Sequence, residues 1–212
     1  MNIEYLGHSA FLISAEKTVV TDPFGDIGYP MKRVKADYCL ISHGHFDHCA
    51  KENVKGAVVI DSAEKVKLAK DISLECVKTF HDDMHGARRG MNNVYKFVMG
   101  GVTFCHFGDL GESFNDTTAK AIGRCDVLFL PVGGNYTIDD KNAYLYAEAT
   151  SAKLIVPMHF KTPRSKIDIA PLGPFKSRYI AVIEAKDVFE TDREAIDGLS
   201  EKTLLTFDTD KF

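Results

Sequence analysis

The sequence predicts an α+β fold in which two mixed β-sheets pack together and helices lie outside them. Two observations indicate this fold. Short apolar runs recur along the chain, and the early runs follow one another directly whereas the later ones alternate with segments of helical pattern. A length of 212 residues suits one domain with a sizeable core and leaves little room for a second. We therefore expect residues 1–212 to form one domain.

The strands are expected where apolar runs lie between turn signals. The run at 36–42 is nearly all apolar, which is typical of a strand buried on both faces. Gly100-Gly101 separates two later runs and indicates a hairpin turn. The expected strands are residues 2–6, 10–14, 18–21, 36–42, 57–60, 74–80, 94–99, 102–107, 127–131 and 154–158.

Two segments between these strands have a helical pattern. Ser62 can cap a helix over residues 62–70, whose apolar positions fall along one side. The motif Thr-Ile-Asp-Asp at 137–140 resembles a capping box with Asp in place of Glu. It predicts a helix that continues to about Thr150.

Composition excludes several classes of protein. The formal net charge of −4 disfavours nucleic-acid binding, which needs clustered Lys and Arg. The five cysteines are odd in number and form no CxxC motif, so we expect free thiols in a reducing compartment. The first residues do not resemble a signal peptide, and no stretch reaches the 18 or so apolar residues of a membrane span. These absences lead us to expect a cytoplasmic protein without a membrane partner.

The strongest local signal is the segment His-Gly-His-Phe-Asp-His at residues 43–48, directly after a strand expected to be buried. If the segment stays near-extended, His43 and His45 point the same way and can hold one ion. Asp47 and His48 fall on a turn and can face a second ion. Imidazole and carboxylate groups suit zinc and similar ions. Four potential ligands within six residues therefore predict a metal site rather than a histidine-rich surface loop.

Other polar residues also stand where expected strands end. His81 and His159 each follow a strand directly, and Asp109 closes another. In sheets covered by helices, ligands bind outside the strand ends because loops can present polar groups there. We therefore expect these side chains to converge on the 43–48 segment.

The pattern His-x-His-x-Asp-His is the signature of the metallo-β-lactamase fold superfamily, which this chain resembles from Gly7 to about Thr162. Its other motifs stand in the order of that superfamily, with Asp22 in Thr-Asp-Pro-Phe and Asp109 in Phe-Gly-Asp-Leu-Gly. The segments Leu-Gly-His-Ser-Ala-Phe and Pro-Val-Gly-Gly-x-Tyr-Thr-Ile-Asp resemble the L-ascorbate-6-phosphate lactonase-like branch of metal-dependent hydrolases. The resemblance implies a four-layer αββα sandwich.

The resemblance also implies a role for each matching position. It implies two divalent ions, zinc before manganese or iron, with ligands as follows: His43, His45 and His81 for the first ion, Asp47, His48 and His159 for the second, and Asp109 bridging both. Asp22 would not bind metal but would hydrogen-bond the ligand loop and hold its shape. Without the resemblance, Asp22 is equally well a turn residue before Pro23.

Three histidines are left with two interpretations each. His85 lies four residues after His81 and competes with it as a ligand, and we favour His81 because it ends the strand. His8 and His106 either line the pocket or are core histidines with satisfied hydrogen bonds.

Basic residues follow two of the expected ligands. Arg88 and Arg89 come after His81, and Lys161 begins a basic stretch after His159. They are either solvated side chains or the binding groups for an anionic small-molecule substrate, since a guanidinium matches phosphate and carboxylate groups.

The expected activity is hydrolysis of a small ester, lactone or phosphodiester by hydroxide generated between two ions. Asp47 and Asp109 would act as ligands at the reacting centre, with Asp22 supporting them. The sequence contains no GxSxG motif for a serine nucleophile, and His45 stands where di-iron oxidoreductases of this fold carry Glu. The alternative is a non-catalytic metal- or ligand-binding protein, although such a protein has no need of a complete ligand set.

Overall fold

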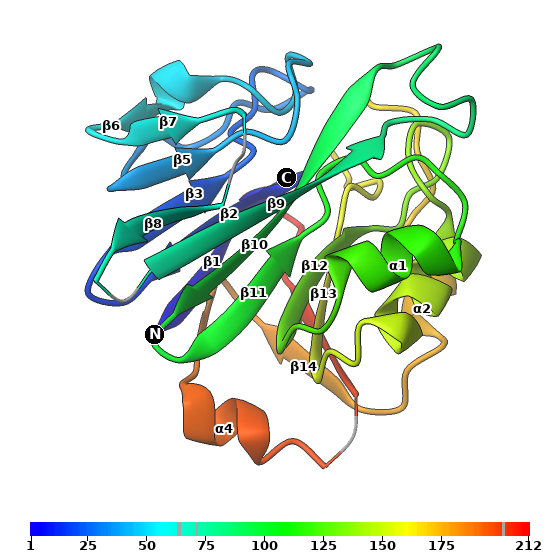
Figure 1. Cartoon of the computed structure of the whole chain (residues 1–212). Helices are drawn as coiled ribbons and strands as arrows, with labels where there is room; N and C mark the ends of the chain where they lie inside the picture. The colour runs from blue at the N-terminus through cyan, green and yellow to red at the C-terminus, as the bar shows by residue number, and fades with distance from the viewer. Residues whose placement is uncertain (63–64, 71, 201) are drawn as a thin grey trace.

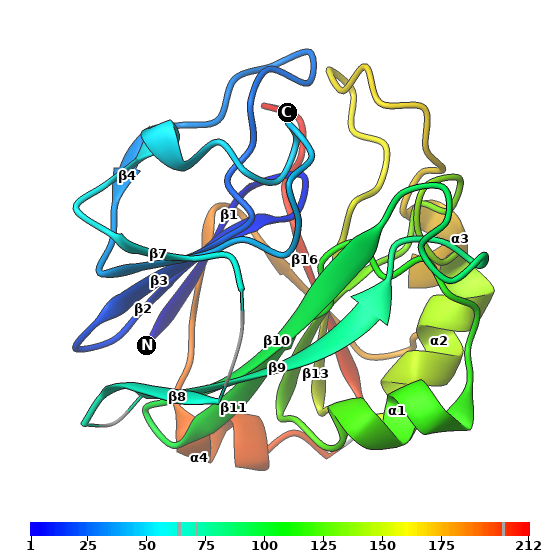
Figure 2. The ribbon, with the colours of Figure 1, turned by 45° about the horizontal axis from the view of Figure 1, so that its top comes forward.

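Two mixed sheets lie face to face in the computed structural model, which describes residues 1–62, 65–70, 72–200 and 202–212 (Figures 1 and 2). One sheet has the strand order β15 (Val188–Glu190), β1 (Asn2–Gly7), β2 (Ala10–Ser14), β3 (Thr18–Thr21), β5 (Tyr38–Leu40) and β7 (Val58–Ile60). The other has the order β14 (Val182–Ala185), β16 (Thr203–Phe207), β13 (Leu154–Met158), β12 (Val127–Pro131), β11 (Val102–His106), β10 (Met91–Met99), β9 (Ile72–Phe80) and β8 (Val66–Ala69). Strands β4 (Val34–Lys35) and β6 (Val54–Lys55) form a separate short pair.

Helices flank this sandwich. Figures 1 and 2 show α1 (Asp116–Ile122) and α2 (Asp140–Ala149) on the outer face of the larger sheet, with α3 (Gly173–Lys176) next to α2. The short 3₁₀ turn η1 (Lys51–Asn53) lies on the side of the smaller sheet, and α4 (Arg193–Asp197) leads into β16. The expected α+β class with two mixed sheets is confirmed. Among the described residues, every helix is too short or too polar to cross a membrane.

Aromatic rings connect the two sheets in the core. Phe11 of the smaller sheet packs on Phe129 of the larger one, with ring centroids 4.5 Å apart. Phe104 stacks with both Phe129 and Phe97, and all four side chains are buried. Truncating a buried Phe costs about 3–5 kcal/mol, so this layer holds the two sheets in a fixed relation. The ligand loops described below depend on that relation because they come from both sheets.

Local sequence signals account for several turns and caps. Gly100 and Gly101 both have positive φ, at 58° and 76°, and connect β10 to β11 as the expected hairpin turn. The helix expected after 137–140 is α2, but its N-cap is Asp139, which accepts from the Asn142 N–H at 2.9 Å. Thr137 lies outside the helix because residues 137–138 are held in a turn by hydrogen bonds to Gly134 and Leu110.

The expected helix over residues 62–70 is wrong where the structure describes it. Residues 63 and 64 lie outside the described residues, and Val66–Ala69 is strand β8, paired antiparallel with β9. A short amphipathic segment has little helical stability of its own. The backbone hydrogen bonds of β9 decide its conformation instead.

The directions of the strands bring many loops to one edge. In the smaller sheet β3 is parallel to β5, and β1 runs the same way because both β1 and β3 are antiparallel to β2. In the larger sheet β9, β11 and β13 share one direction. The residues that follow these six strands are gathered at that edge.

Candidate metal centre

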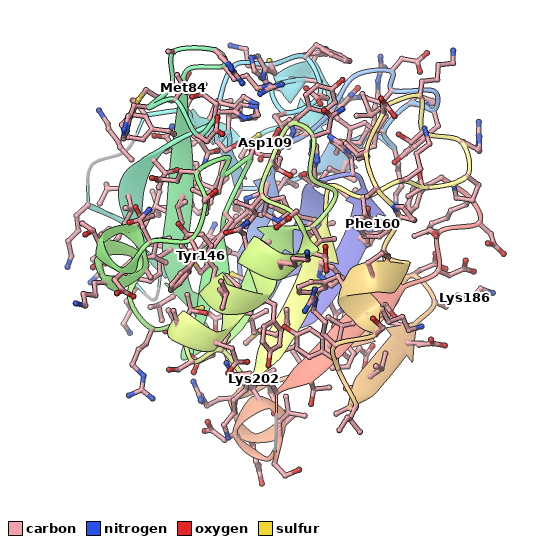
Figure 3. The ribbon with its side chains drawn as sticks, turned by 90° about the vertical axis from the view of Figure 1, so that its right-hand side faces the viewer. Met84, Asp109, Tyr146, Phe160, Lys186 and Lys202 are labelled. Carbon is pink, nitrogen blue, oxygen red and sulfur yellow. The ribbon has the colours of Figure 1, made fainter. Side chains whose placement is uncertain are left out.

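Histidine and aspartate side chains from these six strand ends converge on one place. They are His8 after β1, Asp22 after β3, His43 to His48 after β5, His81 after β9, Asp109 after β11 and His159 after β13. Asp109 is buried, and Figure 3 shows it in the upper part of the view, below and to the right of Met84 of the loop that follows β9. A larger hollow of about 700 Å³ lies at the opposite end of the strands, between the 15–17 turn and the Gly100-Gly101 turn, away from these groups.

His43, His45 and His81 form the first ligand group, and their ligating atoms lie within 4.8 Å of one another. The ring of His43 packs 4.6 Å from that of His45 and 4.6 Å from that of His81. The 43–48 segment bends rather than stays extended, and the His48 N–H donates to the His45 carbonyl at 2.9 Å. His81 and His43 are buried whereas His45 is exposed, so this group opens toward solvent.

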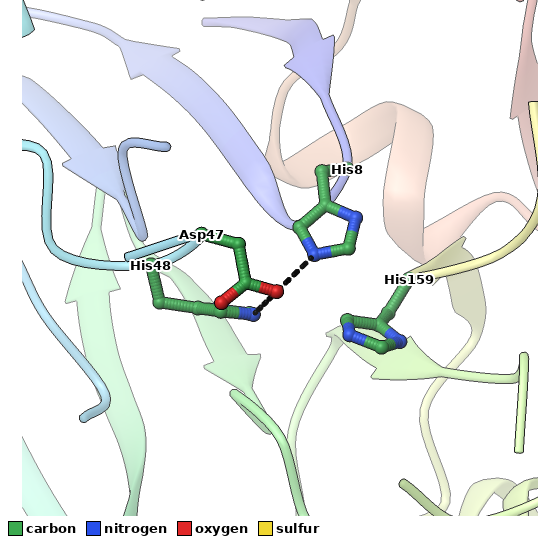
Figure 4. Close-up of side chains that lie close together, drawn as sticks. All are labelled: His8, Asp47, His48 and His159. Carbon is green, nitrogen blue, oxygen red and sulfur yellow. Dashed lines mark hydrogen bonds and ion pairs between the residues drawn. The ribbon is translucent and has the colours of Figure 1, made fainter. Parts of the chain in front are cut away.

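His8, Asp47, His48 and His159 form the second ligand group, whose ligating atoms also lie within 4.8 Å of one another. Figure 4 shows the four side chains gathered around one space. Asp47 and His48 come from the 43–48 loop, whereas His8 and His159 each follow another strand. His8 Nε2 lies 3.3 Å and His48 Nε2 3.8 Å from Asp47 Oδ2. All four residues are buried.

Asp109 lies between the two groups. Its Oδ2 atom is 3.3 Å from His81 Nε2 and 3.8 Å from His43 Nε2 in the first group. The same atom is 3.2 Å from His48 Nε2 and 3.4 Å from His159 Nε2 in the second group. One carboxylate therefore faces both groups, which is the position of a bridging ligand.

Unpaired buried atoms indicate that this cluster fits metal ions. His43 Nε2, His48 Nε2 and Asp109 Oδ1 are buried without a hydrogen-bond partner among the described residues. Such atoms are costly unless a bound group satisfies them. Ligands arranged tetrahedrally at zinc distances are separated by about 3.3 Å, close to most of the separations around Asp109. The arrangement and chemistry of these donors therefore suit two ions of the zinc type.

Asp22 supports ligands of both groups without joining either. Its Oδ2 atom lies 2.9 Å from His48 Nδ1 and accepts from the Ser42 hydroxyl at 2.7 Å, and its Oδ1 accepts from the Ser42 N–H at 2.7 Å. Ser42 Oγ in turn lies 2.9 Å from His43 Nδ1. These contacts leave the Nε2 atom of each imidazole directed at the cluster. The backbone of Asp22 has φ 37°, an unusual conformation for Asp that these hydrogen bonds hold in place.

Asn92 fixes the loop that carries Asp109. Its side-chain oxygen accepts from the Asp109 N–H at 2.9 Å, and its amide group donates to Phe107 O and Thr79 Oγ1. Gly108, with φ 54°, allows the close approach, since a Cβ there would lie 2.3 Å from Asn92 Oδ1. The position of the central carboxylate is therefore set by the side chain of Asn92 on β10 as well as by its own loop after β11.

Burial and neighbouring charges shift the pKa values of the buried histidines in opposite directions. Burial, together with His48, lowers the pKa of His43 to about 3, and burial with His159 lowers that of His8 to about 4. Burial also opposes charge on His48, but Asp109 and Asp22 raise its pKa well above the ordinary value. Burial alone would raise the pKa of Asp47, yet His8 and His48 lower it. Without an ion, the site thus holds neutral imidazoles at His43 and His8 beside the ionised carboxylate of Asp47, whereas His48 would release a proton on binding a cation.

A cavity of about 490 Å³ opens over both ligand groups. Its wall contains the exposed ring of Phe46, the cations Arg89 and Lys166, the ring of Tyr136 and the carboxylate of Asp168. The Arg89 guanidinium lies 5.2 Å from the centre of the Tyr136 ring. A small molecule in this cavity would therefore meet both positive and aromatic groups next to the histidines.

The other residues singled out from the sequence lie further away. His85 is exposed, and its ring packs 5.2 Å from that of Phe80. Arg88 lines a neighbouring hollow rather than this cavity. The amine of Lys161 donates to the carbonyls of Ser165 and Ile167, so it braces its own loop instead of pointing to the cavity. Of the three cationic residues expected to bind substrate, Arg89 lies in the cavity wall together with Lys166, whereas Arg88 and Lys161 do not line this cavity.

Sequence reasoning left some residues of this site undecided or unnamed. His8 belongs to the second ligand group, and the signal was its place directly after a strand, as for His81 and His159. His106 is a core histidine, since its Nε2 lies 2.9 Å from the Ser9 carbonyl and its Nδ1 accepts from the Gly108 N–H. Phe46 and Tyr136 carry no spacing signal because their place in the cavity wall depends on how the loops fold.

Comparison with known proteins gives a consistent match. Residues 2–159 match the family model described as "Beta-lactamase superfamily domain". A protein described as a UPF0173 metal-dependent hydrolase from Carboxydothermus hydrogenoformans is 32% identical, over 84% of this chain and 92% of its own length. Another of that description, from Geobacillus thermodenitrificans, is 33% identical over 82% of this chain and 94% of its own length.

A solved structure is similar along almost the whole chain. The crystal structure of a protein described as a Zn-dependent hydrolase of the metallo-beta-lactamase superfamily, from Thermotoga maritima, aligns with a TM-score of 0.80 and 33% identity. The alignment covers 97% of both chains. The similarity therefore extends over nearly the whole of this fold.

Proposed function

The chain belongs to the beta-lactamase superfamily and is a metal-dependent hydrolase of that superfamily, and we propose that it works with two divalent ions at the Asp109 cluster. His43, His45 and His81 would hold the first ion. The observation that carries this proposal is the place of Asp109 Oδ2, within 3.2–3.8 Å of imidazole nitrogens from both groups. Zinc suits this donor set best, with manganese and iron as alternatives.

Asp47, His48 and His159 would hold the second ion, and Asp109 would bridge the pair. Two bound ions supply a hydroxide at neutral pH by lowering the pKa of a water toward 7. Asp47 stays ionised and lies in the cavity wall, where it can orient the attacking group. Asp22 and Ser42 keep His48 and His43 directed at the reacting centre.

The cavity favours a small anionic substrate containing an ester, lactone or phosphodiester bond. Arg89 and Lys166 stand on two different loops of the cavity wall, which also contains Asp47, Asp109 and Asp168. With two divalent ions bound, positive charge would exceed negative charge in the cavity, and a cleft with an excess of positive charge concentrates anions. The contact with Tyr136 holds the Arg89 guanidinium in one orientation, which lowers the cost of binding a planar carboxylate or a phosphate. Phe46, 61% exposed, offers an apolar surface for the rest of the molecule.

The test is a turnover assay of chelator-treated protein reconstituted with Zn²⁺ or Mn²⁺. Aryl esters, lactones and bis(p-nitrophenyl) phosphate are the substrates. We expect activity that returns with two equivalents of metal and is lost in Asp47→Asn. Metal binding without turnover of any of the three substrate types would favour the alternative, a metal- or ligand-binding protein of this fold.

Recognition of the anion is tested separately with Arg89→Gln. We expect KM for a carboxylated ester to rise about tenfold, the loss expected for one charge-assisted hydrogen bond, while KM for a neutral analogue changes little. Arg88→Gln is the matched control because that side chain lies outside the cavity. An equal rise in KM for both esters in Arg89→Gln would show that Arg89 does not recognise the charge of the substrate.

A further inference from the structure

The backbone of His8 has an uncommon conformation that hydrogen bonds from its neighbours hold in place. It follows β1 in a left-handed conformation with φ 52°, which is uncommon for a residue other than glycine. Its carbonyl accepts from the Tyr5 hydroxyl at 3.0 Å and from the His159 N–H at 3.1 Å. Strained backbone of this kind persists where surrounding contacts fix it, and it occurs often at functional sites. The backbone of His8 is thereby tied directly to that of His159.

The imidazole of His8 is directed into the second ligand group. It is 1% exposed, and its ring lies 4.4 Å from that of His159 and 5.1 Å from that of His48. Figure 4 shows the ring on the far side of Asp47 from His48, facing the space that the four side chains enclose. The Nε2 atom is 3.3 Å from Asp47 Oδ2 and within 4.8 Å of the ligating atoms of His48 and His159.

We propose that His8 Nε2 is a terminal ligand of the second ion. This inference rests on the proposed two-ion function and adds a residue to it. The second ion then has three imidazole ligands and the terminal carboxylate of Asp47, in addition to the bridging Asp109. Its environment differs from that of the first ion, which has three imidazoles and no terminal carboxylate.

The separation of His8 from Asp47 fits two ligands of one ion as well as it fits a hydrogen bond. The structural His48–Asp22 pair in the same site is 2.9 Å apart, whereas His8 Nε2 and Asp47 Oδ2 are 3.3 Å apart. Neighbouring ligands on one zinc-like ion are separated by about 3.3 Å. The contacts of Asp109 with His48, His81 and His159 fall in the same range, from 3.2 to 3.4 Å.

His106 shows how a buried histidine without such a role looks in this protein. It lies close to the same loops, but both ring nitrogens are in contact with backbone groups, at Ser9 and Gly108. His8 shares the burial of His106, yet its Nε2 faces the carboxylate of Asp47 and the imidazoles of His48 and His159. The two residues therefore form a natural pair for comparison.

The experiment measures metal content and Co²⁺ absorption of wild-type protein, His8→Asn, His8→Gln and the control His106→Gln. Asn tolerates the left-handed backbone but is too short to reach the position of Nε2. Gln can place an amide donor near that position and keep a hydrogen bond to Asp47. We expect two ions in wild type and control, and one tightly bound ion in both His8 variants. Affinity for the second ion should fall ~100-fold or more, beyond the 10–100-fold typical of losing an outer hydrogen-bond partner.

Each other result overturns the assignment. Second-ion affinity restored by Gln but not by Asn would make His8 a positioning residue that acts through Asp47. Two ions bound with unchanged affinity and unchanged Co²⁺ absorption in both variants would exclude His8 from the site. A wild-type protein that binds no second ion would overturn the two-ion function itself, and the His8 assignment with it.

Discussion

At the scale of single residues, Asp22 has the widest influence because it reaches ligands of both groups, His48 directly and His43 through Ser42. It receives hydrogen bonds from Ser42 and lies 2.9 Å from His48 Nδ1. Burial by itself would raise the pKa of Asp22, but the contact with His48 and its charge keep the pKa lowered. The carboxylate therefore stays ionised and fixes which ring nitrogen of His48 is available to a cation.

Replacing Asp22 by Asn should weaken binding of both ions by about 10–100-fold, the range for loss of a partner that orients ligands. The amide puts an N–H group where His48 and the Ser42 hydroxyl need an acceptor. A titration with Zn²⁺ against a competing chelator measures the affinity. Asp26→Asn is the control, since Asp26 is an exposed turn residue that accepts only from the Gly28 N–H among the described contacts. Unchanged affinity in Asp22→Asn would remove the orienting role.

The ligand residues were accessible to sequence reasoning because most of them lie in one short segment or directly end a strand. The spacing of His43, His45, Asp47 and His48 places two ligand groups on one bend, and the structure brings both groups together as expected. The position of Lys166 in the cavity wall could not be predicted from the sequence. It depends on a loop in which Lys161 donates to the carbonyls of Ser165 and Ile167, and composition alone could not distinguish the two lysines.

At the scale of elements, the loops that carry the ligands pack on one another through small residues. A Cβ on Gly111 would lie 2.3 Å from the carbonyl carbon of His81 and 2.6 Å from the Asp82 nitrogen. Both are backbone atoms, so the loop after β9 would have to move. The loop after β11 thus limits where the loop after β9 can lie.

Gly111→Ala should therefore displace His81 and weaken the first ion selectively, with a loss of stability of roughly 1–3 kcal/mol from overpacking. Gly173→Ala is the matched control, because a Cβ there meets no described atom within 4 Å. Metal content and chemical denaturation measure the two effects. Full metal content in Gly111→Ala would show that the loops are not coupled.

The hairpin of β2 and β3 is tied to β5 by Asp37. Its carboxylate accepts from Lys17 Nζ, the Thr18 N–H and the Thr18 hydroxyl, each at 2.8 Å. These contacts, with Lys17 first, lower the pKa of Asp37 from 3.8 to about 2. Because the folded pKa is depressed, the stabilisation is complete above pH 3.8 and is lost as the pH falls through 2.

Asp37→Asn should lower stability by about 1 kcal/mol at pH 7, a small value because the carboxylate is partly exposed. The difference from wild type should shrink between pH 4 and pH 2, where the wild-type carboxylate takes up its proton. Urea denaturation at several pH values in this range measures the difference. A difference independent of pH would show that charge on Asp37 does not stabilise the fold.

Each of the ten expected strands lies within a few residues of an observed strand. β8 was not predicted, because its conformation depends on antiparallel pairing with β9 rather than on its own pattern. The short strands β4 and β6 and the late strands β14, β15 and β16 were not predicted either. The strand at 36–42 is shorter than expected, since β5 ends at Leu40 and the next residues bend to present Ser42 and His43. The local apolar pattern therefore identifies most strands, whereas pairing with neighbouring strands and the bends that present ligands determine where each strand begins and ends.

At the scale of the whole molecule, the candidate site joins the two sheets. His43 and His48 come from the smaller sheet, and His81, Asp109 and His159 come from the larger one. Ions held between them bind only the folded protein. They should stabilise the packing of one sheet on the other.

Addition of Zn²⁺ to metal-free protein should raise Tm by roughly 10 °C when the free ion is about a thousandfold above its Kd. Differential scanning calorimetry measures the shift. Ca²⁺ at the same concentration should have little effect, because it prefers sites made of oxygen ligands. A Tm that does not respond to Zn²⁺, or that responds equally to Ca²⁺, would argue against an ion between the sheets.

The measurement that bears most directly on the two-ion site is anomalous diffraction from crystals of zinc-saturated protein, recorded on both sides of the zinc absorption edge. We expect two peaks about 3.5–4 Å apart. One should touch His43, His45 and His81, the other Asp47, His48 and His159, with Asp109 between them. A zinc-saturated crystal without a peak among His43, His45 and His81 would contradict the two-ion site.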